Sequence, residues 1–434
     1  MSTATVENWT ECDLSDLIAA MESGQRPYGG VTEDGGEVPS LGGENIRQEG
    51  GLELSAVRKV PTAFYNLMAK GVLRAEDVLI NKDGANTGKV GLYEGQFPVA
   101  AINEHVFLLR GKPERLAQRF LYRLLAWGAN QQLVRTKISG SAQPGLKSDF
   151  IRFFPVRVPA APTEQSQIAV VLDTVDEVIA ETEAVIAKLK QVRAGLLHDL
   201  LTLGLDTSGQ LRDPIVRPEQ FQDSTLGRVP VDWVVRTLED VTEPSAPICY
   251  GIVQAFGYVP NGVPVLVIRD LLGDYVTGVH RTSPSIDAAY ARSRVRAGDV
   301  LISVKGTIGR LCVVPQHYSG NISRDLARIR PLEWVRSRFL FHLLSSPLGQ
   351  KTLEKAQVGT TRAELSIAPL RRLAFAFPRT LEQDAIARIL DEQETALCGC
   401  ETELVKVRKL KAGLMADLLT GRVRVPETIA TGRA

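Results

Sequence analysis

Two glycine-rich segments hold residue types that could bind a phosphate group. They read KDGANTGKVG at 82–91 and VKGTIGRLCVV at 304–314. A nucleotide-binding phosphate loop needs four residues between its glycines, a Ser or Thr after the lysine, and a helix that begins there. Gly84 and Gly88 have only three residues between them, and Lys89 is followed by valine and a strand-like run. The spacing therefore excludes a nucleotide loop and predicts two hairpins, which either present basic residues to a polyanion or are purely structural.

A second pair of segments combines cations, hydroxyls, glutamine and glycine. These are LVRTKISGSAQPGLK at 133–147 and LEKAQVGTTRAEL at 353–365, which we expect to form loops after a helix over 114–133 and its counterpart. Such side chains suit phosphates and base edges, although a solvated connecting loop has the same composition. Together the hairpins, the loops and two further arginines give these candidate DNA-binding residues: Lys82, Asn86, Lys89, Arg135, Lys137, Ser141, Lys147, Arg269, Lys305, Arg310, Arg324, Lys355, Thr360 and Arg362.

The sequence offers no set of residues for catalysis or metal binding. The five cysteines form no CxxC pair, and the five histidines have no metal-ligand spacing such as HExxH. No GxSxG nucleophile turn and no Asp-Pro-Pro-Tyr methyltransferase motif is present. No apolar run approaches the roughly 18 residues of a membrane span, and the N-terminus is acidic. We therefore expect a non-catalytic cytoplasmic protein with no metal, no cofactor of its own and no membrane contact.

The net charge of the chain is +1, but the charged residues are distributed unevenly along it. Residues 56–162 carry 16 basic and 7 acidic side chains, and residues 227–380 carry 20 basic and 12 acidic ones. The intervening segment, 163–226, has 5 basic and 11 acidic side chains. Two separate basic blocks fit two surfaces that face a polyanion, although ordinary solvated surfaces remain the alternative.

The chain contains the same unit twice. AGLLHDLLT at 194–202 returns as AGLMADLLT at 412–420, and the preceding EQSQIAVVLD at 164–173 returns as EQDAIARILD at 382–391. Upstream, RFLYRLL at 119–125 matches RFLFHLL at 338–344, in the same order. With only two copies of about 200 residues, a solenoid is excluded, because solenoid repeats run to about 20–50 residues.

Each unit ends in a long helical pattern whose apolar residues alternate at spacings of four and three. This spacing predicts a coiled-coil seam on two helices of about 40 residues, roughly 60 Å each, that end at Gly204 and Gly421. A long core helix would be the alternative. The expected seam residues are Ile168, Leu172, Ile179, Ile186, Leu189, Leu196, Leu200, Ile386, Leu390, Leu397, Leu404, Val407, Leu414 and Leu418.

The architecture expected from these patterns is a two-fold repeat of a mixed α/β (α+β) domain and a long helix. Short β-type runs alternate with one clear helix before the proline at each boundary. We expect a first domain at 1–162, a helix at 163–203, a linker at 204–226, a second domain at 227–380, a helix at 381–421 and a tail at 422–434.

The chain resembles the specificity subunits of type I restriction-modification systems over nearly its whole length. The resemblance is carried by the duplicated unit, by the proline followed by Glu164-Gln165 and Glu382-Gln383, and by helices closing in LKQVRAGLLHDLLT and VRKLKAGLMADLLTGRV. The RPYGG and VPSLGGENI opening of the first unit, at 26–46, is also similar to that family.

This resemblance implies two target recognition domains that each read half of a split double-stranded DNA site, spaced by an antiparallel intramolecular coiled coil. It also implies two modification subunits, which bind S-adenosylmethionine and methylate adenine, and restriction subunits that use ATP and magnesium. An alternative left open by the residues is a non-DNA scaffold whose coiled coil joins two protein-binding domains.

Overall fold

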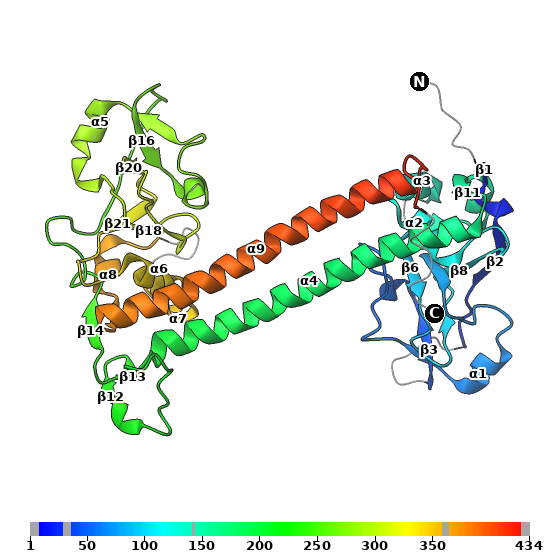
Figure 1. The fold of residues 1–434 in the computed structure, drawn as a ribbon, viewed down its shortest axis with the longest axis horizontal. Helices are drawn as coiled ribbons and strands as arrows, with labels where there is room; N and C mark the ends of the chain where they lie inside the picture. The colour runs from blue at the N-terminus through cyan, green and yellow to red at the C-terminus, as the bar shows by residue number, and fades with distance from the viewer. Residues whose placement is uncertain (1–7, 29–35, 141–143, 358–363, 427–434) are drawn as a thin grey trace. The chain divides into compact units, whose positions relative to one another are not determined.

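A computed structural model describes residues 8–28, 36–140, 144–357 and 364–426 (Figure 1). The chain divides into two compact units: unit 1 holds residues 1–183 and 403–434, and unit 2 holds residues 184–402. The division crosses both long helices, α4 (Pro162–Thr202) and α9 (Thr380–Leu418). Each unit therefore contains one globular domain and a segment of both helices.

The globular part of unit 1 has a four-stranded antiparallel sheet at its centre. Its strand order is β2 (Ile18–Ser23), β8 (Val106–Gly111), β5 (Asp77–Asn81) and β6 (Val90–Tyr93). The central strand β5 is buried on both faces, because Val78 and Ile80 pack with Phe120 of a helix while Leu79 packs with Ile102 of a second sheet. Burial on both faces explains why DVLIN reads as a continuous apolar run rather than an alternating one.

The second sheet of unit 1 has three short strands. Strand β3 (Val38–Leu41) pairs antiparallel with β4 (Lys59–Val60) and parallel with β7 (Ala101–Ile102). A separate pair, β1 (Trp9–Asp13) and β11 (Pro155–Pro159), brings the start of the domain to its end.

Unit 2 repeats these two sheets and the separate strand pair. Its four-stranded sheet has the order β15 (Cys249–Tyr250), β21 (Leu326–Ile329), β18 (Val300–Ser303) and β19 (Leu311–Val313). Its three-stranded sheet joins β16 (Val263–Leu266) to β17 (His280–Thr282) and, in parallel, to β20 (Asn321–Ile322). Strands β14 (Val234–Thr237) and β22 (Ala374–Phe377) form the third pair. The internal repeat expected from the sequence is therefore confirmed in the fold.

One predicted helix is in fact two. The sequence favoured a single helix over 114–133, but the structure has α2 (Gln118–Ala126) and α3 (Gly128–Lys137), separated at Trp127, whose φ of −62° and ψ of 133° are extended. The second copy breaks at the same place, between α6 (Ser337–Ser345) and α7 (Pro347–Lys355), where Ser346 accepts a hydrogen bond from the Gly349 amide. Gly128 in one copy and Pro347 in the other permit this break at the start of the second helix.

Several short elements complete the described chain. The helices are α1 (Thr62–Leu67), α5 (Pro284–Ala289) and α8 (Ile367–Arg372). The strands are β9 (Ile138–Ser139), β10 (Gly145–Leu146), β12 (Phe221–Ser224) and β13 (Gly227–Pro230). The 3-10 turns are η1 (Leu14–Asp16), η2 (Gly43–Asn45), η3 (Ser148–Phe153), η4 (Pro218–Gln220), η5 (Ile268–Leu272) and η6 (Ala291–Ser293). Within the described ranges, no helix combines the length and apolar content needed to cross a membrane.

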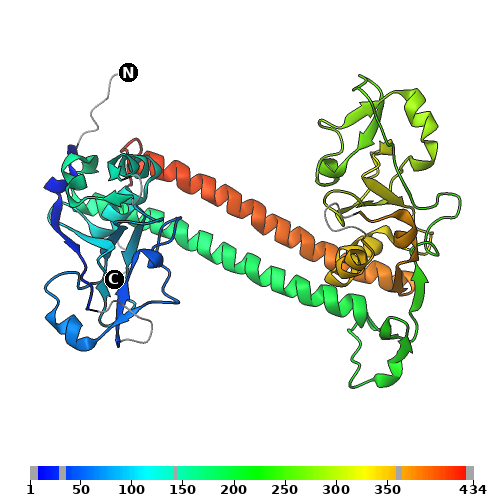
Figure 2. The ribbon, with the colours of Figure 1, turned by 180° about the vertical axis from the view of Figure 1, so that it is seen from behind.

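The two long helices have the lengths predicted, 41 residues in α4 and 39 in α9 (Figures 1 and 2). Gly204 and Gly421 follow their ends with φ of +66° and +73°, which is the left-handed conformation that stops a helix. The fourteen predicted seam residues are all buried or half-buried, and Ile186 and Leu404 near the middle are 7% and 9% exposed. These side chains therefore lie on the sides of the helices that face away from solvent.

The helices run antiparallel. In unit 1, Asp176 pairs with Lys411 and Glu183 pairs with Arg408, whereas in unit 2 Lys190 pairs with Glu401 at 2.9 Å. Residue numbers therefore rise along α4 as they fall along α9, which only an antiparallel arrangement allows.

The repeated AGLLHDLLT phrase packs into the globular domains as well as into the seam. Leu197 and Leu200, near the end of α4, are buried in one cluster with Phe339 of the second domain. Leu418, at the end of α9, is buried with Phe120 of the first domain. Each helix therefore begins in the core of the domain that precedes it and ends in the core of the other domain.

Candidate nucleic-acid interface

The two predicted hairpins are present in the structure. Strand β5 pairs antiparallel with β6, and β18 pairs antiparallel with β19. Positive φ angles at Gly84 and Gly88, +82° and +84°, and at Gly306 and Gly309, +67° and +84°, turn the chain at each tip. A Cβ added to Gly88 would lie 2.7 Å from the Val134 side chain, so glycine also lets the hairpin approach α3.

Some hairpin residues already bind within the protein. The Lys82 ammonium donates to the Glu104 carbonyl at 3.3 Å and lies 5.5 Å from the centre of the Phe107 ring. Asn86 donates from Nδ2 to the Ile46 carbonyl at 3.1 Å. Lys305 forms a 3.0 Å ion pair with Glu364. Lys89 is half-buried and Arg310 is exposed, so Arg310 is the more accessible of these two tip cations.

The loop expected at 133–147 is partly helical. Arg135 and Lys137 lie on the last turn of α3, and Lys355 is the final residue of α7, so the loops begin later than predicted. The reason is the break at the start of α3 and α7, which lets a second helix begin and carry these cations. Lys147 is exposed after β10. Ser141, Thr360 and Arg362 lie outside the described residues.

The structure brings each hairpin against the loop of its own domain. Asp83 forms a bridge with Gly145, and the Leu146 amide donates to the Lys82 carbonyl at 2.7 Å. In the second domain Lys305 forms a bridge with Glu364, and the Leu365 amide donates to the Val304 carbonyl at 2.9 Å. Hairpin and loop therefore form one continuous edge in each domain, at equivalent positions.

Two further candidates lie elsewhere on the second domain. The Arg269 side chain is 72% exposed on η5 and donates to the Gly278 carbonyl at 3.3 Å. Arg324 is 55% exposed between β20 and β21, 3.9 Å from Asp325. Arg324 lies two residues before β21, the strand that pairs with β18 of the hairpin, whereas Arg269 lies on η5, after β16 of the other sheet.

An acidic and amide-rich cavity beside the first hairpin was not expected from the sequence. The cavity, of about 410 Å³, is lined by Gly43, Glu44, Asn81, Asp83, Gly84, Ala85, Asn86 and His105. A neighbouring cavity of about 570 Å³ is lined by residues including Lys82 and Lys147. Asp83 and His105 were missed because cations are the residues expected to contact phosphate, and no spacing signal linked two residues 22 positions apart.

Other cations of the basic blocks have structural roles. Arg110 donates from Nε to Asp77 at 2.7 Å, and Arg330 donates from Nε to Asp299 at the same distance. These arginines occupy equivalent positions on β8 and next to β21, and the hydrogen bonds to the buried aspartates raise the pKa of both guanidinium groups. They hold the sheet together and are not free for a polyanion.

The Glu-Gln pair at each boundary joins a domain to its long helix. Gln165 is fully buried, accepts from the Ala117 amide at 2.8 Å and donates to the Pro159 carbonyl at 2.8 Å. Gln383 is also fully buried and accepts from the Arg336 amide at 2.8 Å. These are satisfied buried amides, so the motif is explained by structure rather than by DNA contact.

The glutamates of this motif anchor the segment that follows the other helix. Glu382 accepts from the Leu205 amide at 2.8 Å, from Arg212 at 2.7 Å and from the Trp233 indole at 3.1 Å. In unit 1, Glu164 pairs with Arg424 in the same way. Each helix start is therefore tied to the end of its antiparallel partner.

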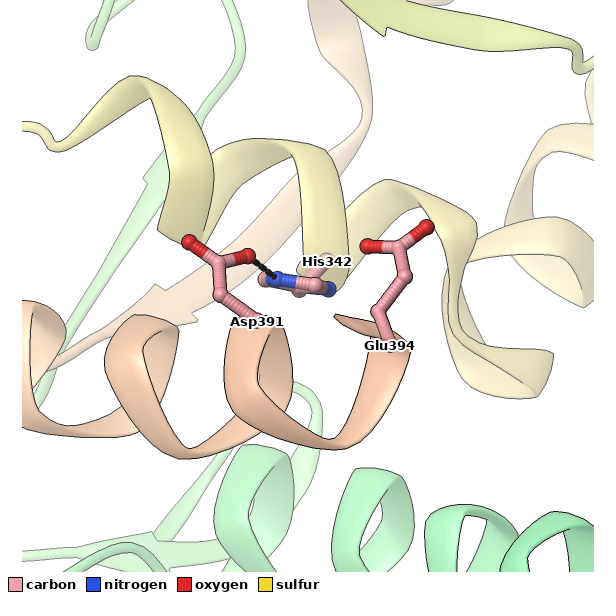
Figure 3. Close-up of side chains that lie close together, drawn as sticks. All are labelled: His342, Asp391 and Glu394. Carbon is pink, nitrogen blue, oxygen red and sulfur yellow. Dashed lines mark hydrogen bonds and ion pairs between the residues drawn. The ribbon is translucent and has the colours of Figure 1, made fainter. Parts of the chain in front are cut away.

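A cluster of side chains fastens the second domain to α9 (Figure 3). His342 on α6 is fully buried, and its Nε2 lies 2.6 Å from Asp391 Oδ1. Arg338 binds the same aspartate and donates to Glu394 at 3.1 Å. Burial lowers the pKa of His342. Burial alone would raise the pKa of the Asp391 carboxyl, but hydrogen bonds from Arg338 and His342 bring that pKa below its ordinary value.

His342, Asp391 and Glu394 could hold a metal ion, since one ligand atom of each lies within 4.8 Å of the others. The Arg338 guanidinium, however, already binds both carboxylates. In unit 1 the equivalent of His342 is Arg123, whose guanidinium binds Asp173 and Asp176 of α4. An arginine binds both carboxylates in each copy, Arg338 in unit 2 and Arg123 in unit 1, which favours an ion-pair contact over a metal centre.

Comparisons with known proteins identify relatives of the whole chain. The family model described as the type I restriction modification DNA specificity domain matches residues 6–191 and 230–403. The chain is 27% identical over 364 residues to the type I restriction enzyme EcoBI specificity subunit of Escherichia coli, covering 80% of this chain and 74% of that protein. It is 23% identical to the MjaVIII specificity subunit of Methanocaldococcus jannaschii, covering 96% and 94%.

The fold is similar to that of a type I restriction-modification S subunit from M. genitalium. The TM-score is 0.58 over 96% of this chain and 97% of that structure, at 14% identity. At this identity the likeness shows a shared fold, in agreement with the duplicated topology described above.

Proposed function

The chain belongs to the type I restriction-modification DNA specificity family, and from this premise we propose that its two domains each read one half of a bipartite double-stranded DNA target. The protein is a non-catalytic DNA sequence-recognition subunit, and this decides against the scaffold that binds only proteins.

The observation that carries the two-half-site proposal is the same edge in both domains. A glycine-turn hairpin and the loop after α3 or α7 meet at equivalent positions, through the Asp83–Gly145 and Lys305–Glu364 bridges. A hairpin is narrow enough to enter a major groove of about 12 Å, where base edges are distinguishable. We assign phosphate or base contact to Lys82, Asn86, Lys89, Arg135, Lys137, Ser141, Lys147, Arg269, Lys305, Arg310, Arg324, Lys355, Thr360 and Arg362.

Two modification subunits are the proposed partners of the pseudo-symmetric chain. Two copies of one surface suit two copies of one partner. We propose that these subunits bind S-adenosylmethionine and methylate adenine, that restriction subunits using ATP and magnesium join them, and that the assembly works in the cytoplasm. The chain itself supplies the sequence readout.

The long helices are proposed to set the number of unread base pairs between the half-sites. At about 1.5 Å per residue, α4 extends over roughly 60 Å. We propose the domain limits 1–162 and 227–380, with 163–203 and 381–421 as spacer helices, 204–226 as linker and 422–434 as tail. The stretch at 204–226 includes η4 and β12, so it has local structure.

Methylation mapping tests the proposal. Genomic DNA from cells that carry this chain with its modification subunits should show one methylated motif of two specified halves and an unspecified gap. A continuous motif would refute the two-domain assignment.

Salt dependence of binding gives a second test with purified components. The affinity of the assembled complex for its target should fall by orders of magnitude between about 50 and 200 mM salt, because phosphate contacts release counterions. Affinity that does not change with salt would show that the basic edges do not face DNA.

A further inference from the structure

The 410 Å³ cavity beside the first hairpin has the features of a built polar site. Asn81, at the end of β5, is 1% exposed and lines the cavity, and its side-chain Oδ1 has no hydrogen-bond partner among the described residues. Its Nδ2 is used, because it donates to the Asp83 carbonyl at 2.9 Å. A buried amide oxygen without a donor is costly, so a donor supplied by a ligand would be favoured here.

The cavity is rich in acceptors. Asp83 Oδ1 lies 2.7 Å from His105 Nδ1, which leaves the second carboxylate oxygen of this 35% exposed side chain available. Glu44 adds another carboxylate to the lining. Gly43 is needed for this shape, because a Cβ there would lie 2.2 Å from Asn81 Oδ1. The side chains thus favour a neutral or cationic donor group, whereas a phosphate would be repelled.

The equivalent position in the second domain has the opposite charge. Asp83 and Lys305 each lie two residues beyond the hairpin strand β5 or β18, and each bridges to the loop of its own domain. At the Asn81 position the second domain has Ser303, whose hydroxyl is satisfied by Thr307 and Arg310. The hairpin tips therefore have the same geometry and opposite hydrogen-bonding character.

We propose that Asp83 and Asn81 read an exocyclic amino group, adenine N6 or cytosine N4, in the half-site of the first domain, while Lys305 reads an acceptor such as guanine O6 or N7 in the other. This inference rests on the proposed function. Carboxylate and amide oxygens accept from these amino groups in the major groove, and lysine donates to guanine. The pairing of His105 with Asp83 orients the carboxylate, so His105 is a positioning residue.

A double-mutant cycle between protein and DNA tests the proposal. The complex of this chain with its modification subunits is titrated with duplexes of the mapped target, in which each adenine becomes purine and each cytosine becomes 2-pyrimidinone, one at a time. These analogues lack only the amino group. Wild type should lose about tenfold affinity at one position of one half-site, and Asp83→Ala should lose nothing more there. The sensitive position distinguishes adenine from cytosine.

Matched variants separate this inference from the proposed function. Asp16→Ala removes one exposed negative charge from the same domain and should keep the full tenfold sensitivity to the analogue. Lys305→Ala should lose sensitivity to 7-deazaguanine in the other half-site only. If Asp83→Ala remains as sensitive as wild type at every position, Asp83 is not a reader. If wild type itself does not distinguish its target from random duplex, the proposed function fails instead.

Discussion

Arg123 and His342 occupy the same position in the two copies of the fold, on α2 and α6, and each is held by an aspartate of a long helix. Arg123 binds Asp173 and Asp176, whereas His342 leaves its Nδ1 buried and without a partner among the described residues. The permanent cation of one copy is therefore replaced by a titratable group in the other.

This difference between Arg123 and His342 predicts that the second domain is sensitive to acid. Burial lowers the pKa of His342 from 6.5, so the unfolded chain holds more protons than the folded chain below about pH 6.5. The free energy of unfolding should therefore fall as pH drops through that window, by at most about 1.4 kcal/mol per unit from this group. Hydrogen exchange of α6 in the full chain, measured at about pH 7 and about pH 5.5 and corrected for intrinsic rates, reports the change.

The matched variant is His342→Gln, which keeps a polar side chain and removes the titration. Its protection in α6 should change less between the two pH values than that of wild type, while protection in α2 follows the same course in both proteins. Equal pH dependence of α6 in the two proteins would assign the effect to another group, such as Asp391, whose lowered pKa acts at more acidic pH.

The contact between α2 and α4 in the first domain should depend strongly on Arg123. Its side chain is 6% exposed, and removing it leaves Asp173 and Asp176 without their main cation. Arg123→Ala should lower the free energy that protects α2 from exchange by about 3 kcal/mol, as for other broken buried pairs. Arg119→Ala, at a 35% exposed neighbour that binds the same aspartate, should cost less than about 1 kcal/mol. Comparable losses from both variants would contradict a buried joint.

The long helices and the repeat could be predicted because both depend on local periodicity. The alternating spacing of four and three between apolar residues continues through Ile186 and Leu404, and both side chains are buried in the structure. The docking of Leu197 and Leu418 into globular cores could not be predicted, because it depends on the antiparallel pairing of distant segments. The same limit applies to Asp83 and His105, which come together only when β5 and β8 pair.

Less of the candidate interface than of the fold could be predicted from the sequence. Cation-rich composition located the hairpins, but it does not distinguish a free cation from one that is used internally, such as Arg110 with Asp77.

The break between α2 and α3 at Trp127 could not be predicted from the apolar spacing. Apolar spacing continues across it, and only the extended backbone at that residue separates α2 from α3.

The hairpin cations of the second domain should contribute to DNA affinity. Lys305→Ala combined with Arg310→Ala should weaken target binding and reduce the slope of log affinity against log salt by about 1. A cation that contacts a phosphate, as expected for Arg310, adds about 1 to that slope, whereas Lys305 as a guanine reader contributes affinity at one base. Arg236→Ala, at an exposed arginine of β14, is the control and should leave the slope nearly unchanged. Because Arg310 is exposed and Lys305 is half-buried at a tip, the double variant should keep its fold by circular dichroism. Unchanged affinity would make this hairpin structural.

Ion pairs between α4 and α9 fix which segments face each other. Lys190 pairs with Glu401, and Glu183 pairs with Arg408. Residues 184–190 of α4 and residues 401–407 of α9 are one heptad on each helix; each heptad contains one partner of the first pair and adjoins one partner of the second. Deleting both heptads together removes both partners of the Lys190–Glu401 pair and keeps the seam in phase, because seven residues are two turns of a coiled coil.

Deletion of 184–190 together with 401–407 should shorten the unread gap of the methylated motif by roughly three base pairs. Seven residues extend over about 10.5 Å of helix, and a base pair rises about 3.4 Å. The bases specified in each half-site should stay the same, because neither hairpin is changed. Deleting 184–190 alone is the control. This deletion shifts α4 against α9, so it should abolish methylation or disrupt the pairing of the two helices. If the complex that contains the double-deletion variant methylates a motif with the original gap, the helices do not set the spacing. The two domains must then be positioned by their partners.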